Sequence, residues 1–375
     1  MSDTIPILHI IKSLGRGGAE MLLPETLKLH NKKKFSFHYL YFLPWKDQMV
    51  SSLELAGGKV TCIPASNNVA LLLQARKVAS YIRTHKIRLV HAHLPWAGVV
   101  ARIAGKITGV PVIYTEHNKQ ERYHIATRLL NLATLNWLNA LVAVSRDVEE
   151  SIRKHKPKLK VPLRVILNGV NTTHFAPGYI DGTDVRARLG IPSDAPVIGT
   201  IAVFRFQKRL DVWLSVAKSI IGQIPQARFI IVGDGPLKAQ LHEKARSLEL
   251  DGIVHFAGLQ TEVRPFLASL DLYMMSSVFE GLPIALLEAM SSGCPVISTR
   301  AGGVGEVITD GSDGYLCPVD EPERLADLAI AVLNDSEKQM TLSAKARQTI
   351  IEFFSMEKMV TELEALYSDF LTTVN

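Results

Sequence analysis

The sequence predicts an α/β protein built from two doubly wound, Rossmann-like domains in series. Three observations support this prediction. Short apolar runs, typical of buried parallel strands, alternate with helical patterns along the whole chain. The alternation is interrupted once, in the Gly-, Asp- and Pro-rich segment 177–196, and then resumes. A length of 375 residues, with 47% hydrophobic and 21% charged residues, is sufficient for two complete cores.

The first predicted domain comprises residues 1–176. Its expected strands are apolar almost throughout, as in a sheet that is covered on both faces. Helical patterns such as 71–83 and 127–139 lie between these strands and complete βαβ units. The expected strands are 7–11, 37–42, 60–63, 89–92, 112–115, 140–144 and 164–167.

The second predicted domain comprises residues 197–355 and follows the linker region 177–196. It repeats the same alternation, with expected strands at 197–203, 228–232, 254–257, 272–275 and 296–298. Ligands of doubly wound sheets bind beyond the carboxyl ends of the strands. Motifs at those ends are therefore expected to meet in a cleft between the two domains.

Composition narrows the class of protein. The three cysteines have no close spacing, which indicates neither a disulfide framework nor a zinc site and favours a reducing compartment: Cys62, Cys294 and Cys317. The first residues include Asp3 but no basic region, so no signal peptide is expected. No run reaches about 18 apolar residues, so no transmembrane helix is expected. These features favour a cytoplasmic protein.

The net charge of +6 is unevenly divided along the chain. Residues 1–180 contain 25 Lys and Arg against 10 Asp and Glu, a net +15, and residues 181–375 contain 17 against 26, a net −9. The basic first half favours contact with a polyanion or an anionic bilayer, with solvated lysines as the alternative. The basic run 153–160 has no interleaved aromatics, so nucleic acid is not an expected partner.

The most informative stretch is 279–290, FEGLPIALLEAM. Glu280 is expected in the loop before an apolar helix, and Glu288 about two turns into that helix. Free N–H groups at a helix start favour an anionic ligand, and ionised carboxylates accept hydrogen bonds from sugar or ribose hydroxyls. A capped amphipathic helix with two solvated acids is the alternative.

Cations follow the first expected strand of the second domain at Arg205, Lys208 and Arg209. An Arg fork and a Lys point charge at a strand end suit a diphosphate, whereas a solvated loop is the alternative. The sharp turn 233–235, GDG, ends the next strand, and Gly258 follows the third.

Three motifs end strands of the first domain. Gly17 and Gly18 precede a helix expected near Met21, where the backbone could approach a ligand or simply make a tight turn. His91 and His93 share one strand face, as two metal ligands would, but no third ligand has a readable spacing. A structural or cleft-lining role is therefore favoured over a metal site. The polar triple 116–118, which contains His117, is expected to face a ligand.

Taken in order, these motifs resemble those of the family-4 retaining glycosyltransferases of the GT-B fold, over nearly the whole chain. The most specific element is Glu280-x7-Glu288, followed by the glycine-rich segment 302–306. Each motif alone is ambiguous, but their joint order is specific. One departure is the spacing of Arg205 and Lys208, which are three positions apart, closer than the family commonly shows.

The resemblance implies a donor site in the second domain. Arg205 and Lys208 would hold the nucleotide diphosphate, and Glu288 would accept the ribose hydroxyls. The nucleobase would rest against the backbone near Gly258. The donor sugar would be held by Glu280 together with the backbone of Gly281, Leu282, Pro283 and Ile284.

The resemblance also assigns the first domain to the acceptor. His117 would line the sugar pocket from that domain, and Gly17 and Gly18 would approach the phosphates or the acceptor. A final helix within 356–375 would cross back to pack on the first domain. The catalytic set implied in this way is Glu280, His117, Arg205 and Lys208.

The expected activity is that of a retaining hexosyltransferase (EC 2.4). Fixed cations can stabilise the departing diphosphate, and no Asp-x-Asp occurs, so neither a metal ion nor another cofactor is expected. The expected donor is a UDP-sugar, with GDP-mannose as the alternative. The expected acceptor is a glycan or lipid-linked precursor of a cell-surface polysaccharide or lipopolysaccharide, at the inner face of the cytoplasmic membrane. Two other functions stay open: a nucleotide-sugar 2-epimerase of similar fold, and a non-catalytic nucleotide-sugar binder.

Overall fold

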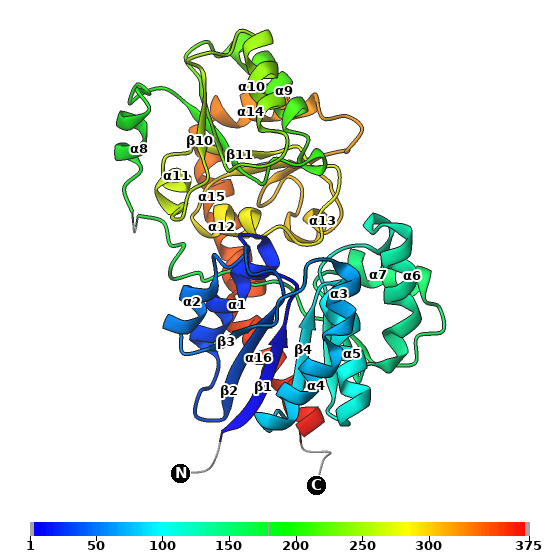
Figure 1. Cartoon of the computed structure of the whole chain (residues 1–375). Helices are drawn as coiled ribbons and strands as arrows, with labels where there is room; N and C mark the ends of the chain where they lie inside the picture. Colours follow the sequence, from blue (N-terminus) through cyan, green and yellow to red (C-terminus); the bar gives the residue numbers. More distant parts are fainter. Residues whose placement is uncertain (1–3, 179, 372–375) are drawn as a thin grey trace. The chain divides into compact units, whose positions relative to one another are not determined.

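A computed structural model describes residues 4–178 and 180–371. The chain divides into two compact units: unit 1 extends to Asn168 and resumes at Met356, and unit 2 spans Gly169–Ser355. Each unit contains one parallel sheet with helices on both faces (Figure 1). The prediction of an α/β protein with two doubly wound domains is therefore confirmed.

The sheet of unit 1 has the strand order β3-β2-β1-β4-β5-β6-β7, and all its pairs are parallel. The chain extends the sheet in one direction from β1 and then starts again on the other side of β1 with β4. The carboxyl edge between β1 and β4 is thus the topological switch point of the unit. The strands are β1 (Ile5–Ile10), β2 (Phe35–Tyr41), β3 (Lys59–Cys62), β4 (Leu89–His93), β5 (Val112–Glu116), β6 (Ala140–Ala143) and β7 (Leu163–Val165).

Two helical patterns of unit 1 are interrupted where the sequence predicts continuous helices. The expected helix 71–83 is two helices, α3 (Asn68–Leu73) and α4 (Ala75–Thr84), separated at Gln74. The expected helix 127–139 is α6 (Ile125–Thr134) followed by the 3-10 turn η2 (Leu135–Trp137). The other helices are α1 (Gly18–Leu29), α2 (Val50–Leu55), α5 (Pro95–Thr108), α7 (Arg146–His155) and the 3-10 turn η1 (Gln120–Arg122).

The helix α16 (Met356–Leu371) returns to unit 1, as the resemblance implies, and contacts α1 and β4 (Figure 1). Tyr367 is fully buried, and its hydroxyl lies 2.7 Å from His91 Nδ1. One carboxylate oxygen of Glu364 accepts from the N–H of Asn31 at 2.7 Å and lies 2.9 Å from His30 Nδ1. The last helix is therefore an integral part of the core of unit 1.

The sheet of unit 2 has the order β10-β9-β8-β11-β12-β13 and is also parallel. Alternate residues of β9 enter two separate cores: Phe229 and Ile231 join one cluster, and Ile230 and Val232 join the other. This alternation explains why the strand is apolar throughout. The strands are β8 (Val197–Ile201), β9 (Arg228–Val232), β10 (Val254–Gly258), β11 (Leu272–Met275), β12 (Val296–Thr299) and β13 (Tyr315–Cys317).

The segment expected as a linker, 177–196, is not a bare connection. It contains α8 (Thr183–Arg188), and Val185, Ile191 and Ala195 are buried in one of the two cores of unit 2. Arg186 donates to a carboxylate oxygen of Asp271 at 2.8 Å. The remaining helices of unit 2 are α9 (Leu210–Gln223), α10 (Lys238–Ser247), α11 (Arg264–Ala268), α12 (Ile284–Ser291), α13 (Val304–Val307), α14 (Arg324–Leu333), α15 (Ser336–Phe353) and the 3-10 turn η3 (Phe206–Lys208).

Candidate active site

The switch point of unit 2 lies between β8 and β11, which are neighbours in the sheet although three strands apart in sequence. The loop after β8 carries Arg205 and Lys208, and the loop after β11 carries Glu280. The two loops are joined by an ion pair between Lys208 Nζ and Glu280 Oε1 at 2.6 Å. Two of the predicted site residues, 72 positions apart, are thus in direct contact at the edge where doubly wound sheets bind ligands.

Glu280 is held by more than the lysine. Ser277 Oγ donates to the same oxygen, Oε1, at 2.6 Å, and the Glu280 carbonyl accepts from the N–H of Gly303 at 3.4 Å. The side chains of Lys208 and Glu280 are 20% and 11% exposed. Among the described residues, none donates to Oε2 of Glu280. This oxygen can therefore accept from a ligand hydroxyl, and Lys208 keeps two ammonium donors for ligand oxygens.

The three cations after β8 have different environments. Arg209 adopts a left-handed conformation, with φ of 46°, and its guanidinium donates to the Val319 carbonyl at 2.8 Å. Lys208 pairs with Glu280, whereas the side chain of Arg205 is exposed and forms no ion pair within residues 4–178 and 180–371. Arg205 is thus the cation of this loop that can turn toward an anionic ligand at least cost.

The turn 233–235 positions the loop that carries Arg205. The N–H of Phe204 donates to the Asp234 carbonyl at 2.9 Å, and the N–H of Gly233 donates to the Gly258 carbonyl at 2.8 Å. Gly233 has φ of +134°, and a Cβ there would lie 1.9 Å from the carbonyl oxygen of Ala202. The glycine is required because the two loops touch backbone to backbone.

Gly233→Ala is expected to destabilise unit 2 by about 1–3 kcal/mol, because it adds a steric overlap to an unfavourable backbone conformation. It should also weaken donor binding by displacing the Arg205 loop. Urea unfolding and a nucleotide titration would measure the two effects. Gly252→Ala is the matched control, since Gly252 also has positive φ, +70°, but a Cβ there meets nothing within 4 Å. Equal losses in both variants would contradict the proposed role of the close contact.

Glu288 lies on α12, but closer to its start than the sequence predicts. The helix begins at Ile284 after Pro283, so Glu288 is its fifth residue and stands about one turn in, rather than two. Glu288 is 6% exposed, and Leu282 of the preceding loop is buried. Gly281, Leu282, Pro283 and Ile284 thus form a short, packed connection from Glu280 to α12. Gly258 ends β10 and joins the site region through its bond to Gly233.

In unit 1, Gly17 is the N-cap of α1, which begins at Gly18 rather than near Met21. A Cβ on Gly17 would lie 2.4 Å from a carboxylate oxygen of Glu20. Glu20 also accepts from Ser13 Oγ at 3.3 Å, so its side chain folds back over the loop. Because the carboxylate of Glu20 is the end of a flexible side chain, it could move aside, so this contact alone does not require a glycine.

The triple 116–118 has two distinct parts. Glu116 is fully buried and accepts hydrogen bonds from the N–H groups of His117 and Asn118 at 3.1 and 3.4 Å. The same carboxylate is bonded by the side chains of Tyr114, Gln120, Tyr123 and Asn131. Burial raises the pKa of Glu116. Glu116 thus holds the loop in place, and His117 and Asn118 are both partly buried.

His117 belongs to a group of histidines on one face of the unit 1 sheet. Its Nε2 lies 3.4 Å from His93 Nδ1, and His93 Nε2 lies 3.1 Å from His9 Nδ1. His91, on the same strand as His93, contacts Tyr367 and the Thr115 hydroxyl. The sequence alone did not indicate His9, because this residue is 82 positions from His91. The pairing of the strands reveals it, since His9 on β1 lies directly opposite His91 on β4.

The buried histidines predict a stability that falls with acid. Burial lowers the pKa of His117 to about 4 and that of His91 to about 3, from an ordinary value of 6.5. The unfolded chain therefore binds more protons than the folded chain below pH 6.5, so stability is lost as the pH falls toward 4. Each such histidine contributes up to about 1.4 kcal/mol per pH unit in that range.

Urea unfolding at pH 7, 6 and 5 would measure this loss of stability. This pH window is chosen because it lies above the pKa values of ordinary carboxylates. His117→Asn should reduce the slope, whereas substitution of the exposed His124 should leave it unchanged. A midpoint that is constant between pH 7 and 5 would contradict the prediction.

Two family models together match most of the chain. The model "Glycosyltransferase Family 4" matches residues 34–174, and the model "Glycosyl transferases group 1" matches residues 181–349. The first match lies in unit 1, apart from its last residues, and the second lies in unit 2.

Similar proteins carry sugar-transfer names. The chain is 35% identical to N-acetyl-alpha-D-glucosaminyl L-malate synthase of Bacillus anthracis over 191 residues, 51% of this chain and 50% of that protein. It is 26% identical to UDP-Gal:alpha-D-GlcNAc-diphosphoundecaprenol alpha-1,3-galactosyltransferase of Escherichia coli over 315 residues, 80% of this chain and 81% of that protein. The crystal structure of Anabaena HepE (Alr3699) with UDP-glucose superposes with a TM-score of 0.88 at 23% identity, covering 97% of this chain and all of that one.

Proposed function

Because the chain belongs to glycosyltransferase family 4, within the group 1 glycosyl transferases, we propose that it transfers a sugar from a nucleotide-sugar donor to a glycan or lipid-linked acceptor in cell-surface glycoconjugate synthesis. The observation that carries this proposal is the Lys208–Glu280 pair at the switch point of unit 2. It places a cation beside a carboxylate whose second oxygen can accept from a hydroxyl, which suits a sugar bonded to a phosphate.

The proposed donor is a UDP-sugar, with a GDP-sugar as the alternative. The support comes from similar proteins: HepE is solved with UDP-glucose, and the E. coli relative is named for UDP-Gal. In this arrangement Glu280 Oε2 accepts from a donor-sugar hydroxyl, and Glu288 accepts from the ribose. Gly258, at the end of β10, supports the base.

The transfer breaks the bond between the sugar's anomeric carbon and a phosphate oxygen, so negative charge grows on the leaving diphosphate. Lys208 and Arg205 are proposed to stabilise that charge, together with the N–H groups at the start of α12. Charge that is fixed before the reaction needs little reorganisation during it. The cations are proposed to suffice without a metal ion at the diphosphate.

Retention of configuration is part of the proposal. Hydrolytic retaining enzymes use two carboxylates on opposite sides of the scissile bond. Here Glu280 Oε1 is already engaged by Lys208 and Ser277, which suits sugar binding better than nucleophilic attack. The leaving phosphate is proposed to take the acceptor's proton on the same face. Proton NMR of the product would reveal the anomeric configuration, and an inverted product would contradict the proposed retention.

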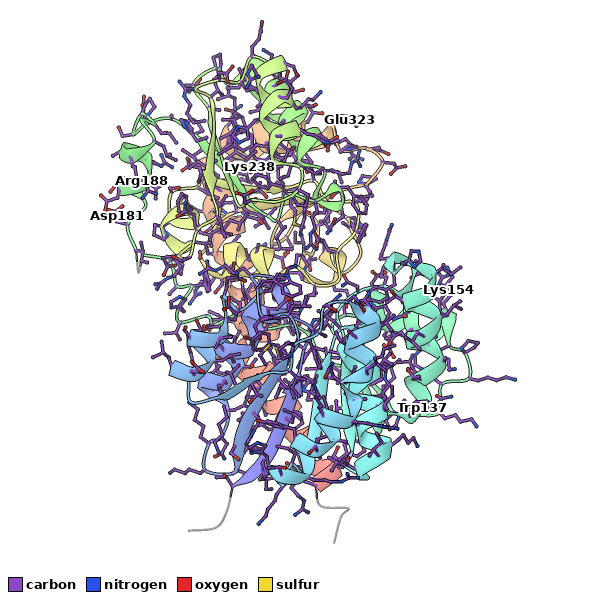
Figure 2. The ribbon with its side chains drawn as sticks, viewed as in Figure 1. Trp137, Lys154, Asp181, Arg188, Lys238 and Glu323 are labelled. Atoms are coloured by element: carbon purple, nitrogen blue, oxygen red, sulfur yellow. The ribbon has the colours of Figure 1, made fainter. Side chains whose placement is uncertain are left out.

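Unit 1 is the proposed acceptor-binding unit, with His117 and the loop at Gly17 and Gly18 as its ligand-facing parts. It also carries a surface suited to an anionic bilayer. Ile125 and Leu129, four residues apart on α6, are both 59% exposed, and Trp137 of η2 is 44% exposed (Figure 2). Asn136 bonds to the backbone of Lys158 and Lys160, which sets the basic run beside this apolar surface. Across residues 4–178 and 180–371, no helix is long and apolar enough to span a bilayer.

A thermal-shift panel of UDP- and GDP-sugars tests donor binding. A ligand at 100 times its dissociation constant stabilises its unit by about 2.7 kcal/mol, which corresponds to roughly 5–11 °C for a domain of this size. Stabilisation by a UDP-sugar and not by the matching GDP-sugar is the expected result. Stabilisation by the GDP-sugar alone would change the proposed base from uracil to guanine. The absence of a shift with every nucleotide sugar would overturn the proposed donor site.

The reaction products separate the proposal from its rivals. A transferase releases free nucleotide and lengthens an acceptor, whereas a 2-epimerase converts the donor sugar, and a binder does neither. Adding EDTA to the assay tests metal independence. Activity that is lost with EDTA and restored by Mg²⁺ or Mn²⁺ would overturn the metal-independent mechanism.

Membrane contact predicts sedimentation with anionic phosphatidylglycerol vesicles but not with neutral phosphatidylcholine vesicles. Raising the salt concentration should weaken the binding because counterions screen it. The double variant Leu129→Ser/Lys158→Glu should reduce the bound fraction, and Lys218→Glu on α9 of unit 2 is the control. Binding that is insensitive to salt and to the double variant would contradict this surface.

A further inference from the structure

We propose that His9, His91 and His93 form a binding site for a borderline transition-metal ion, with Zn²⁺ as the representative, in the core of unit 1. One side-chain nitrogen from each residue lies within 4.8 Å of the other two. All three side chains are buried, with exposures of 2%, 1% and 6%. The proposal does not rest on the proposed sugar transfer and assigns the ion no role in that reaction.

The sheet itself brings the three imidazoles together. His9 on β1 and His91 on β4 are direct partners in the parallel register, so their side chains share a face. His93 lies two residues beyond His91 and therefore points to the same face. Strands β1 and β4 flank the switch point, where the sheet opens at its carboxyl edge. The fold thus specifies three ligands from two adjacent, rigid strands, which is the support a metal site needs.

The spacing is close to what an ion requires. A tetrahedral Zn²⁺ sits about 2.0–2.1 Å from each nitrogen, so its ligand nitrogens lie roughly 3.3 Å apart. His9 Nδ1 and His93 Nε2 are already 3.1 Å apart. The third nitrogen, from His91, lies within 4.8 Å of these two, so the His91 ring must move closer for all three to bind one ion. Three neutral imidazoles suit Zn²⁺ and its neighbours, whereas Mg²⁺ and Ca²⁺ prefer oxygen ligands.

A further observation is the space beside the three histidines. A small cavity of about 20 Å³ is lined by His9, His91, His93, Thr115 and His117 together with mostly apolar side chains such as Leu22, Leu23 and Val142. This is room for about one water molecule, which could serve as the fourth ligand of a three-histidine site.

The surroundings supply the second set of contacts that metal-bound histidines usually have. His91 has Tyr367 Oη 2.7 Å from Nδ1 and Thr115 Oγ1 2.7 Å from Nε2, so either nitrogen can bind the ion while the other stays hydrogen-bonded. His93 would bind through Nε2 and donate from Nδ1 to His117.

The test uses the full chain without an affinity tag, stripped with a chelator and titrated with Zn²⁺ in competition with a chromophoric chelator. The expected result is one tight Zn²⁺ per chain. His9→Leu should weaken this binding by at least about a hundredfold, since loss of even an outer contact commonly costs 10- to 100-fold. His38→Leu is the matched control: His38 is 3% exposed on β2 of the same sheet and contacts Tyr81, outside the triad. Its Zn²⁺ affinity should stay within about threefold of the wild type.

Equal affinity in wild type and His9→Leu, or equal loss in His38→Leu, would overturn the proposal. Co²⁺ bound to the wild-type protein provides a readout that does not depend on any variant folding. A spectrum of tetrahedral Co²⁺ is expected, and an octahedral spectrum would overturn the site. His93→Leu should repeat the loss, and its circular dichroism would verify that the chain is folded.

Discussion

Lys208→Met is expected to lower kcat/KM by about 10²- to 10³-fold, the largest catalytic effect that the structure predicts. The substitution keeps most of the side-chain volume but removes the positive charge. Loss of one preorganised group that stabilises transition-state charge typically costs about 2.7–4 kcal/mol. Because the leaving diphosphate gains charge as the bond breaks, most of the loss should fall on kcat rather than on donor affinity.

Steady-state kinetics with the donor found in the nucleotide-sugar panel would measure this effect. Glu280→Ala should also lower kcat/KM, and the double variant should lose less than the sum of the two, since the residues form one ion pair. Lys218→Met is the matched control: it removes a partly exposed lysine of unit 2 that pairs with the exposed Glu249. A Lys208→Met rate within threefold of wild type would refute the site assignment.

Arg102→Met is expected to destabilise unit 1 by about 3–5 kcal/mol, the largest stability effect. Arg102 is fully buried, and its guanidinium donates to the Thr134 hydroxyl at 2.7 Å and to Asn131 Oδ1 at 3.0 Å. The amide of Asn131 in turn donates to Glu116 at 3.1 Å, so it bridges the buried cation and the buried anion. Without Arg102, the carboxylate of Glu116 would remain in the core without its counter-charge.

Chemical unfolding of the wild type and the variant would give the difference in the free energy of unfolding. The double variant Arg102→Met/Glu116→Gln should regain part of the loss, because it removes the unpaired charge. The control is Arg153→Met, which breaks an exposed pair with Glu149 and should change stability by less than about 0.5 kcal/mol. Additive losses in the double variant would show that the two charges are not coupled.

The strands were predictable because buried parallel strands are apolar along their whole length. For example, 272–275 and 228–232 were expected, and β11 and β9 occupy those residues. The prediction failed where tertiary contacts override local preference. Gln74 interrupts an apparently continuous helix, and β13 is only three residues long, Tyr315–Cys317, too short to give a pattern. The segment 177–196 was expected to be a linker because it is rich in Gly, Asp and Pro, yet three of its apolar residues are buried in unit 2.

The site residues were partly predictable for a related reason. Lys208 and Glu280 each follow a strand, and the switch-point rule makes such positions converge. Their direct ion pair was not predictable, because it depends on which strands are neighbours. For the same reason, the sequence did not reveal His9 or the role of Glu116. The partners of Glu116 lie on four different elements or turns: Tyr114, Gln120, Tyr123 and Asn131. The expectation that the motifs of both units share one cleft stays a prediction.

The return of α16 to unit 1 has a consequence for biosynthesis. Unit 2 is one continuous segment, whereas His91 cannot be buried against Tyr367 until α16, which follows unit 2 in the sequence, has been made. Nascent domains usually mature in the order in which they are made. Here the core of unit 1 is completed only after unit 2 has been translated.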